Sequence, residues 1–129
     1  MYGRGGQIRG YLNLRDTMQC IALAVEKPAE KGELRILNQF TETFSVNQLA
    51  NRVEQVGRKL GLEVKIQHVD NPRKEMEEHY YNPAHHGLLE LGLKPHFMSD
   101  DVLAGMLETV MQHREAIVAS RILPRVRWR

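Results

Sequence analysis

The chain has 129 residues, of which 42% are hydrophobic, and its 18 basic and 16 acidic side chains leave a formal net charge of +2. This length favours a single domain over residues 1–129 with a modest core, and the balanced charge argues against nucleic acid as the partner. No apolar run approaches the roughly 20 residues that cross a bilayer, so no membrane partner is expected. The first residues form no hydrophobic segment, so no secretory signal is expected. The single cysteine, Cys20, excludes an internal disulfide and is expected to pack in the core.

Hydrophobic periodicity and capping residues predict alternating short strands and helices in the first third of the chain. Residues 7–14 alternate well enough for a strand. A helix over residues 17–27 follows, with Asp16 and Gln19 predicted to form its capping box. Residues 33–39 are predicted to form a short second strand.

The middle of the chain holds the clearest predicted helix. Ser45 with Gln48 forms a second capping box at its start, and Gly61 supplies its stop. Residues 63–69 alternate with period two, which predicts a strand with one solvent-facing side. A short helix is predicted over residues 83–91, with proline in its first turn.

The last predicted helix begins at residues 99–101, where two acidic side chains suit the positive end of the helix dipole. Its expected buried stripe is Leu103, Met106, Leu107 and Val110. Apolar residues at helical spacing also mark the first helix: Met18, Ile21, Ala22 and Val25. These stripes need a surface to pack against, and three short strands cannot supply it. The fold class is therefore predicted to be α/β, as a mixed α+β fragment from the later part of a larger protein.

The densest run of polar, hydrogen-bonding residues lies at 71–82, between the third predicted strand and the short helix. Pro72 pushes the residue before it out of helical geometry, so Arg73 leaves the strand on a constrained loop. A guanidinium held there can meet a phosphate with two parallel hydrogen bonds. On the residues alone, a solvated charged loop is the favoured interpretation.

Three stretches, in this order, resemble the C-terminal part of extended short-chain dehydrogenase/reductase enzymes that act on nucleotide sugars. The first is Arg-Gly-Tyr-Leu-Asn-Leu-Arg-Asp at 9–16, with Gly10 in place of the family's first aspartate. The second is the helix opened by Ser-Val-Asn-Gln-Leu at 45–49. The third is the strand, arginine-bearing loop and short helix that end in Leu-Gly-Leu-Lys-Pro at 91–95.

Within that family, residues 3–12, 37–47 and 71–82 are similar to the UDP-sulfoquinovose synthases of sulfolipid biosynthesis, and the resemblance covers essentially the whole chain. It implies the substrate-binding, C-terminal part of an extended Rossmann-fold, NAD-dependent epimerase/dehydratase-like enzyme. The main dinucleotide-binding sheet is expected to be missing from this chain.

The resemblance also implies a reaction and a set of binding residues. Enzymes of this family use bound NAD to oxidise UDP-glucose, and sulfite then adds to an unsaturated intermediate to give UDP-sulfoquinovose. Arg9 and Arg73 would clamp the diphosphate, and Gln7 would donate or accept a hydrogen bond near the substrate. The aspartate position of the related epimerases falls on Met76, so Glu77, or else its neighbour two residues earlier, would meet the uridine ribose.

Two motifs of these enzymes are absent from the sequence: the glycine-rich dinucleotide fingerprint and the Tyr-x-x-x-Lys catalytic pair. The chain alone is therefore expected neither to bind NAD nor to turn over. The partners implied are UDP-glucose or UDP-sulfoquinovose, an N-terminal NAD-binding domain and, as a homo-oligomer, further copies of the chain. The compartment implied is the bacterial cytoplasm or the plastid stroma.

Rival interpretations stay open. The chain could be a non-catalytic interaction module that uses its apolar helix faces, or a fragment of another NAD-dependent nucleotide-sugar epimerase or dehydratase. Clustered histidines at 79, 85 and 86 invite a metal site. None is expected, because adjacent helical histidines point about 100° apart and no regular ligand spacing accompanies them.

Overall fold

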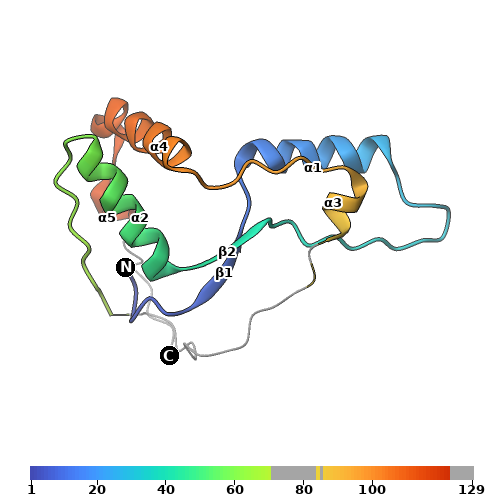
Figure 1. The fold of residues 1–129 in the computed structure, drawn as a ribbon, viewed down its shortest axis with the longest axis horizontal. Helices are drawn as coiled ribbons and strands as arrows, with labels where there is room; N and C mark the ends of the chain where they lie inside the picture. Colours follow the sequence, from blue (N-terminus) through green and yellow to red (C-terminus); the bar gives the residue numbers. More distant parts are fainter. Residues whose placement is uncertain (71–83, 85, 123–129) are drawn as a thin grey trace. The chain divides into compact units, whose positions relative to one another are not determined.

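The computed structural model describes residues 1–70, 84 and 86–122. These residues divide into two compact units, which are described separately: residues 1–7, 45–70 and 99–122 form the first, and residues 8–44, 84 and 86–98 form the second. The elements in chain order (Figure 1) are β1 (Ile8–Tyr11), α1 (Leu14–Glu26), β2 (Glu42–Ser45), α2 (Val46–Lys59), α3 (Gly87–Leu91), α4 (Asp100–Gln112), the 3-10 helix η1 (Arg114–Ala116) and α5 (Ala119–Ile122). The fold is mixed α/β, and among the described residues its sheet has two strands, β1 and β2.

In the second unit, α1 begins three residues earlier than the sequence predicts. Asn13, in extended geometry, caps the helix by accepting a hydrogen bond from the backbone N–H of Arg15 at 3.0 Å. The predicted capping role of Asp16 is therefore wrong. Because Asn13 satisfies the start of the helix, the Asp16 carboxylate lies inside the first turn and points into the unit, where it has no solvent exposure.

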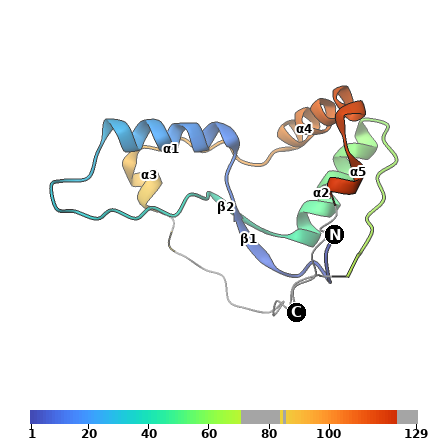
Figure 2. The ribbon, with the colours of Figure 1, turned by 180° about the vertical axis from the view of Figure 1, so that it is seen from behind.

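The core of the second unit lies between α1 and α3, which lie close together in both views (Figures 1 and 2). Cys20, Leu88 and Leu93 are buried there and are packed by three further leucines from the segments around α1. Burial of Cys20 confirms its predicted place. The α3 helix is shorter at its start than the predicted 83–91, and Gly92 ends it with a φ of 111°, in the left-handed region that suits glycine.

The two strands are short, and the second lies later than predicted. The predicted strand over 33–39 is wrong: its apolar residues Leu34 and Ile36 are 85% and 80% exposed, and no described strand pairs with them. The strand that pairs with β1 is β2. Just before β2, Phe40 lies against Gly10, and a Cβ built on that glycine would stand 2.6 Å from the ring.

The first unit confirms the predicted helix α2. Ser45 accepts from the backbone N–H of Gln48 at 3.1 Å, and the Gln48 side chain accepts from the backbone N–H of Ser45 at 2.7 Å. This is a complete capping box. Gly61, with a φ of 75°, follows the helix end as predicted.

Helix α4 begins as predicted and packs against α2. Ser99 caps it by accepting from the backbone N–H of Val102 at 3.2 Å. Lys59 Nζ, at the end of α2, lies 2.7 Å from an Asp100 carboxylate oxygen, and this hydrogen bond lowers the pKa of Asp100. Of the predicted buried stripe, Leu103 is buried, whereas Met106 and Val110 are more than half exposed. The stripe is thus only partly covered in this unit.

Residues 63–69 do not form the predicted strand. Only Val69 makes a bridge, parallel to Tyr2, and the chain before it runs along α2 without a ladder. Its closest approach is at Gly57, where an added Cβ would overlap the Cγ2 atom of Val64. The lack of space therefore requires glycine at this position. In a helix interior without such a close neighbour, glycine costs about 1 kcal/mol relative to alanine.

This close approach predicts opposite effects for two helical glycines. Gly57→Ala should lower the free energy of unfolding, because the new methyl group must displace Val64. Gly105→Ala, in α4, meets nothing within 4 Å and should raise the free energy of unfolding by about 0.5–1 kcal/mol. Urea denaturation followed by circular dichroism measures both. Equal shifts in the same direction would show that Gly57 is not a packing position.

Candidate functional site

The four predicted substrate residues are only partly described by the structure. Arg73 and Glu77 lie outside the described residues. Gln7 belongs to the first unit and Arg9 to the second. The structure therefore does not test whether the four form one site, and the set stays a prediction.

Among the predicted substrate residues, Gln7 has a buried side-chain oxygen that bears on ligand binding. The residue is half-buried, immediately before β1, and its side-chain oxygen is buried without a hydrogen-bond partner in the structure. Leaving a buried acceptor unpaired costs about 1–3 kcal/mol. Such an oxygen is therefore suited to a donor that comes from a bound molecule.

Arg9 lies on β1, and its guanidinium is turned back along its own strand. The Nη1 atom donates to the backbone carbonyl of Ile8 at 2.9 Å. The residue is half-buried, so its stem is held while its planar fork of donors stays near the strand. The forked donors of a guanidinium match a phosphate in general, and one of these donors is engaged here by the Ile8 carbonyl.

The glycine-rich turn before β1 does not fit a dinucleotide. Gly3 and Gly5 have φ values of 62° and 73°, in the left-handed region that favours glycine. The turn leads into a strand, however, and not into a helix N-terminus. Asn47 fills the space beside Gly5. Its side chain donates to the carbonyl of Arg4 at 2.9 Å, and its backbone N–H donates to the carbonyl of Gly5 at 3.0 Å. Asn47 thus engages two carbonyls of the turn, and the turn presents no helix N-terminus of the kind that binds a pyrophosphate.

A buried carboxylate cluster, which sequence reasoning missed, lies in the second unit. Asp16 is fully buried and accepts three hydrogen bonds: from the backbone N–H of His96 at 2.6 Å, from its ring Nδ1 at 2.7 Å, and from the Gln19 side chain at 2.7 Å. Gln19 also donates to the carbonyl of Lys94 at 3.0 Å. The cluster ties the first turn of α1 to the segment that follows α3.

The ring of His96 is oriented by this carboxylate. Its Nδ1 atom faces Asp16, while the side chain remains 46% exposed. A carboxylate on one ring nitrogen fixes which nitrogen carries the proton. The arrangement can hold an imidazole for hydrogen bonding or proton transfer, but among the described residues no other catalytic-type side chain contacts it. The main effect of the Asp16–His96 contact is to hold α1 against the segment after α3.

The thiol of Cys20 is affected by the same environment. Burial raises the pKa of Cys20 above the ordinary value of 9.0, and the nearby charge of Asp16 raises it further. A thiol with a raised pKa is a poor nucleophile at neutral pH. Cys20 is thus a packing residue of the α1 core.

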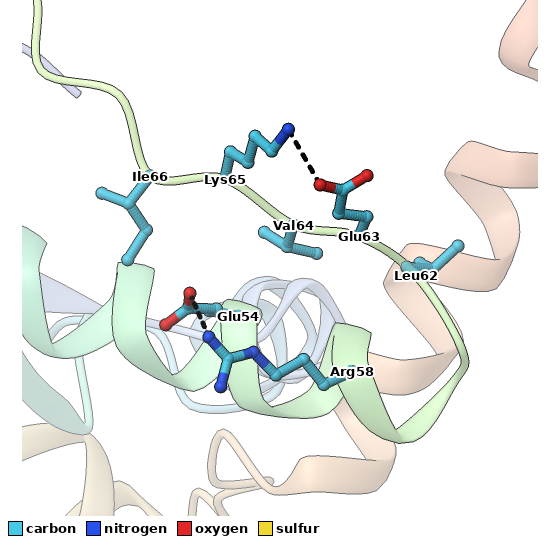
Figure 3. Close-up of a pocket in the computed structure, with 7 residues that line it drawn as sticks. All are labelled: Glu54, Arg58, Leu62, Glu63, Val64, Lys65 and Ile66. Carbon is cyan, nitrogen blue, oxygen red and sulfur yellow. Dashed lines mark hydrogen bonds and ion pairs between the residues drawn. The ribbon is translucent and has the colours of Figure 1, made fainter.

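A surface groove lies in the first unit, between α2 and the segment after it (Figure 3). Its volume is about 690 Å³, and it is lined by Glu54, Arg58 and residues 62–66. Arg58 and Glu54 form an ion pair at 2.8 Å along one wall. Gln7 and Arg9 do not line it, so the groove offers no support for the predicted substrate set.

Neither a metal-ligand cluster nor a membrane-spanning helix is found in the described part of the chain. No group of three or more His, Cys, Asp or Glu side chains there is arranged to hold a metal ion; His79 and His85 lie outside that part. No helix of the described ranges is both long and apolar enough to cross a membrane.

The chain is similar over its whole length to two UDP-sulfoquinovose synthases. It is 51% identical to the chloroplastic UDP-sulfoquinovose synthase of Spinacia oleracea, of which it spans 27%. It is 39% identical to the UDP-sulfoquinovose synthase of Sulfolobus acidocaldarius, of which it spans 33%. No protein-family model matches it. The resemblance predicted from the sequence motifs is thus confirmed, and the chain spans about a quarter to a third of the length of these relatives.

The carboxylate cluster predicts a graded loss of stability. Asp16→Ala removes the acceptor of three buried hydrogen bonds and should lower the free energy of unfolding by roughly 2–4 kcal/mol. His96→Ala should cost less, because its backbone N–H still reaches Asp16. Asp101→Ala, an exposed carboxylate in the first turn of α4, serves as the matched control. Equal losses for Asp16→Ala and Asp101→Ala, measured by urea denaturation, would contradict this role.

The raised pKa of Cys20 predicts a pH dependence with a definite sign. Above pH 9.0 the unfolded chain loses the thiol proton while the folded chain retains it, so the unfolded state is favoured as pH rises. The stability difference between the wild-type chain and Cys20→Ala should therefore be largest below pH 9.0 and shrink above it. Because the wild-type chain and Cys20→Ala contain the same tyrosines and lysines, the effect of these groups on stability cancels in the difference. A difference that does not change with pH would show that the thiol ionises equally in both states.

Proposed function

We propose that the chain is the nucleotide-sugar-binding portion of an NAD-dependent UDP-sulfoquinovose synthase, which makes UDP-sulfoquinovose from UDP-glucose and sulfite. The observation that carries this proposal is the 51% identity over the whole chain to the spinach enzyme of that name. Because the chain spans 27% and 33% of its two relatives, the complete reaction belongs to a longer polypeptide. In this proposal the chain is the C-terminal, substrate-side part of an extended Rossmann-fold enzyme.

The binding role assigned to this part is to hold the UDP-sugar. Arg9 and Arg73 clamp the diphosphate, since two forked cations from separate segments can neutralise a pyrophosphate. The buried, unpaired oxygen of Gln7 accepts a hydrogen bond from a sugar hydroxyl. Glu77, or the glutamate two residues before it, accepts from the ribose hydroxyls of uridine.

The dinucleotide belongs elsewhere in this proposal. The glycine turn lacks the dinucleotide fingerprint and leads into the strand β1, so an N-terminal NAD-binding domain would hold NAD and supply the hydride chemistry. The chain alone would bind substrate without turning it over. The name of the spinach relative includes the word chloroplastic, which supports the plastid stroma as the compartment in a photosynthetic eukaryote; a bacterial source would place it in the cytoplasm.

A second candidate function, an interaction module, is favoured by one face of α1. Four apolar side chains on this helix are exposed by 51–83%: Leu14, Met18, Ile21 and Val25. Side chains of this kind at helical spacing form a stripe that normally packs against another surface. In the leading proposal that surface is provided by the NAD-binding domain; in the second candidate it is an unrelated protein.

The substrate proposal predicts saturable binding of UDP-glucose to the purified chain. Amide chemical shifts should move at residues 7–11 and 71–82 on titration, and UDP alone should compete. Arg9→Ala and Arg73→Ala should each raise the dissociation constant about tenfold or more, because a charge-assisted hydrogen bond contributes about 1.5–3 kcal/mol.

Arg114→Ala is the matched control, since it removes one exposed arginine outside the predicted set. A folded spectrum that does not respond to UDP-glucose would overturn the binding proposal. So would an unchanged dissociation constant in Arg9→Ala and Arg73→Ala. Glucose without UDP should produce no shifts, because the diphosphate is the anchored group.

A further inference from the structure

The turn that leads into Gln7 is held through its backbone carbonyls by one residue of α2. The side-chain Nδ2 of Asn47 donates to the carbonyl of Arg4 at 2.9 Å. The backbone N–H of Asn47 donates to the next carbonyl, that of Gly5, at 3.0 Å. All of these residues belong to the first unit, so Asn47 and the turn form one local arrangement immediately before Gln7.

The start of α2 explains why Asn47 makes both contacts. Ser45 is the cap of α2 and accepts from the backbone N–H of Gln48, and Asn47 is the second residue of the helix. The N–H groups of a first helical turn have no partner within the helix. The carbonyl of Gly5 satisfies the N–H of Asn47, so a single contact completes the helix start and fixes the turn.

The side chain of Asn47 fits closely against Gly5. Gly5 is buried and has a φ of 73°, and a Cβ built on it would stand 2.4 Å from Oδ1 of Asn47. A Cβ built on Gly6 would meet nothing within 4 Å among the described residues. Glycine has the widest choice of backbone conformations, so the Asn47 contacts supply the restraint that residues 5 and 6 lack.

The beginning of the turn is held separately. The carbonyl oxygen of Gly3 lies 2.8 Å from Nδ1 of His68, and the N–H of Gly3 donates to the carbonyl of Val69 at 2.9 Å. These contacts come from the segment after α2 and do not involve Asn47. Loss of the Asn47 contacts would therefore leave Gly3 in place and free residues 4–6, and the movement would pass to Gln7.

We propose that Asn47 is a positioning residue of the substrate site, which acts through the glycine turn to place the side-chain oxygen of Gln7. The inference rests on the proposed function, in which this buried, unpaired oxygen accepts from a sugar hydroxyl. A hydrogen bond weakens steeply when its distance or angle departs from the optimum. An acceptor for a ligand therefore needs support from residues that the ligand does not touch.

The substitution Asn47→Asp separates the turn from the stability of α2. The new side chain has nearly the same shape, but a carboxylate has no donor, so the carbonyl of Arg4 loses its hydrogen bond and faces a negative charge. The same carboxylate suits the positive end of the helix dipole, so α2 keeps a favourable start. Asn47→Ala removes the donor without adding a charge and should have the same effect on binding.

The test measures the dissociation constant of UDP-glucose by calorimetric titration of the 129-residue chain, with folding of each variant checked by circular dichroism. Asn47→Asp should raise the dissociation constant roughly three- to tenfold, as should Gln7→Ala. In the Gln7→Ala background, Asn47→Asp should change it by less than about twofold, because the two residues act as one unit. A loss caused by general destabilisation would instead be the same in both backgrounds.

The pH provides a second readout that a purely structural role would not change. A protonated carboxyl regains an O–H donor, so the ratio of the Asn47→Asp dissociation constant to that of the wild-type chain should fall towards one as the pH is lowered. Asn51→Asp is the matched control, since it makes the same change at an exposed residue of α2. Its ratio should stay near one at every pH.

The wild-type titration separates failure of this inference from failure of the proposed function. A folded wild-type chain that does not bind UDP-glucose would overturn the proposed function, and the role of Asn47 with it. If the wild-type chain binds, an unchanged dissociation constant in Asn47→Asp and Asn47→Ala would overturn the role of Asn47 alone. So would an effect of Asn47→Asp that is undiminished in the Gln7→Ala background.

Discussion

The second unit depends on the Asp16 carboxylate. A charged group with no solvent exposure is tolerated only when its oxygens are met by donors, and here the donors come from Gln19 and from both the backbone and ring of His96. Two of them lie 80 residues away in sequence. The cluster therefore joins the first turn of α1 to the segment after α3, next to the core in which Cys20 of α1 packs with Leu88 and Leu93.

Local signals in the sequence predicted the helices well. The capping box at Ser45 and the left-handed Gly61 depend on neighbours within a few residues, and both are confirmed. Apolar content at 33–39 and alternation at 63–69 predicted strands, and both predictions failed because a strand needs a second strand to pair with. Alternation reports which side chains face a surface, and at residues 62–66 that surface is α2.

The predicted site shows the same difference between signals that depend on sequence neighbours and contacts between distant residues. Contiguous motifs carried the resemblance to UDP-sulfoquinovose synthases, which similarity over the whole chain confirms. Asp16 and His96 could not be connected from the sequence, because an aspartate near a helix start usually indicates a cap and nothing local joins it to a distant histidine. The unpaired oxygen of Gln7 is likewise a property of packing. Arg73 and Glu77 remain predictions, since the described residues do not include them.

Gly10, which stands where the wider family's first motif has an aspartate, lies against the Phe40 ring with no room for a side chain. Phe40 is itself buried, with 6% exposure. The residues at the two positions therefore depend on each other: a polar side chain at position 10 is compatible only with a residue smaller than phenylalanine at position 40. The Phe40 ring thus takes the volume that a side chain at position 10 would need, so β1 gives up a side chain there in favour of a buried aromatic ring.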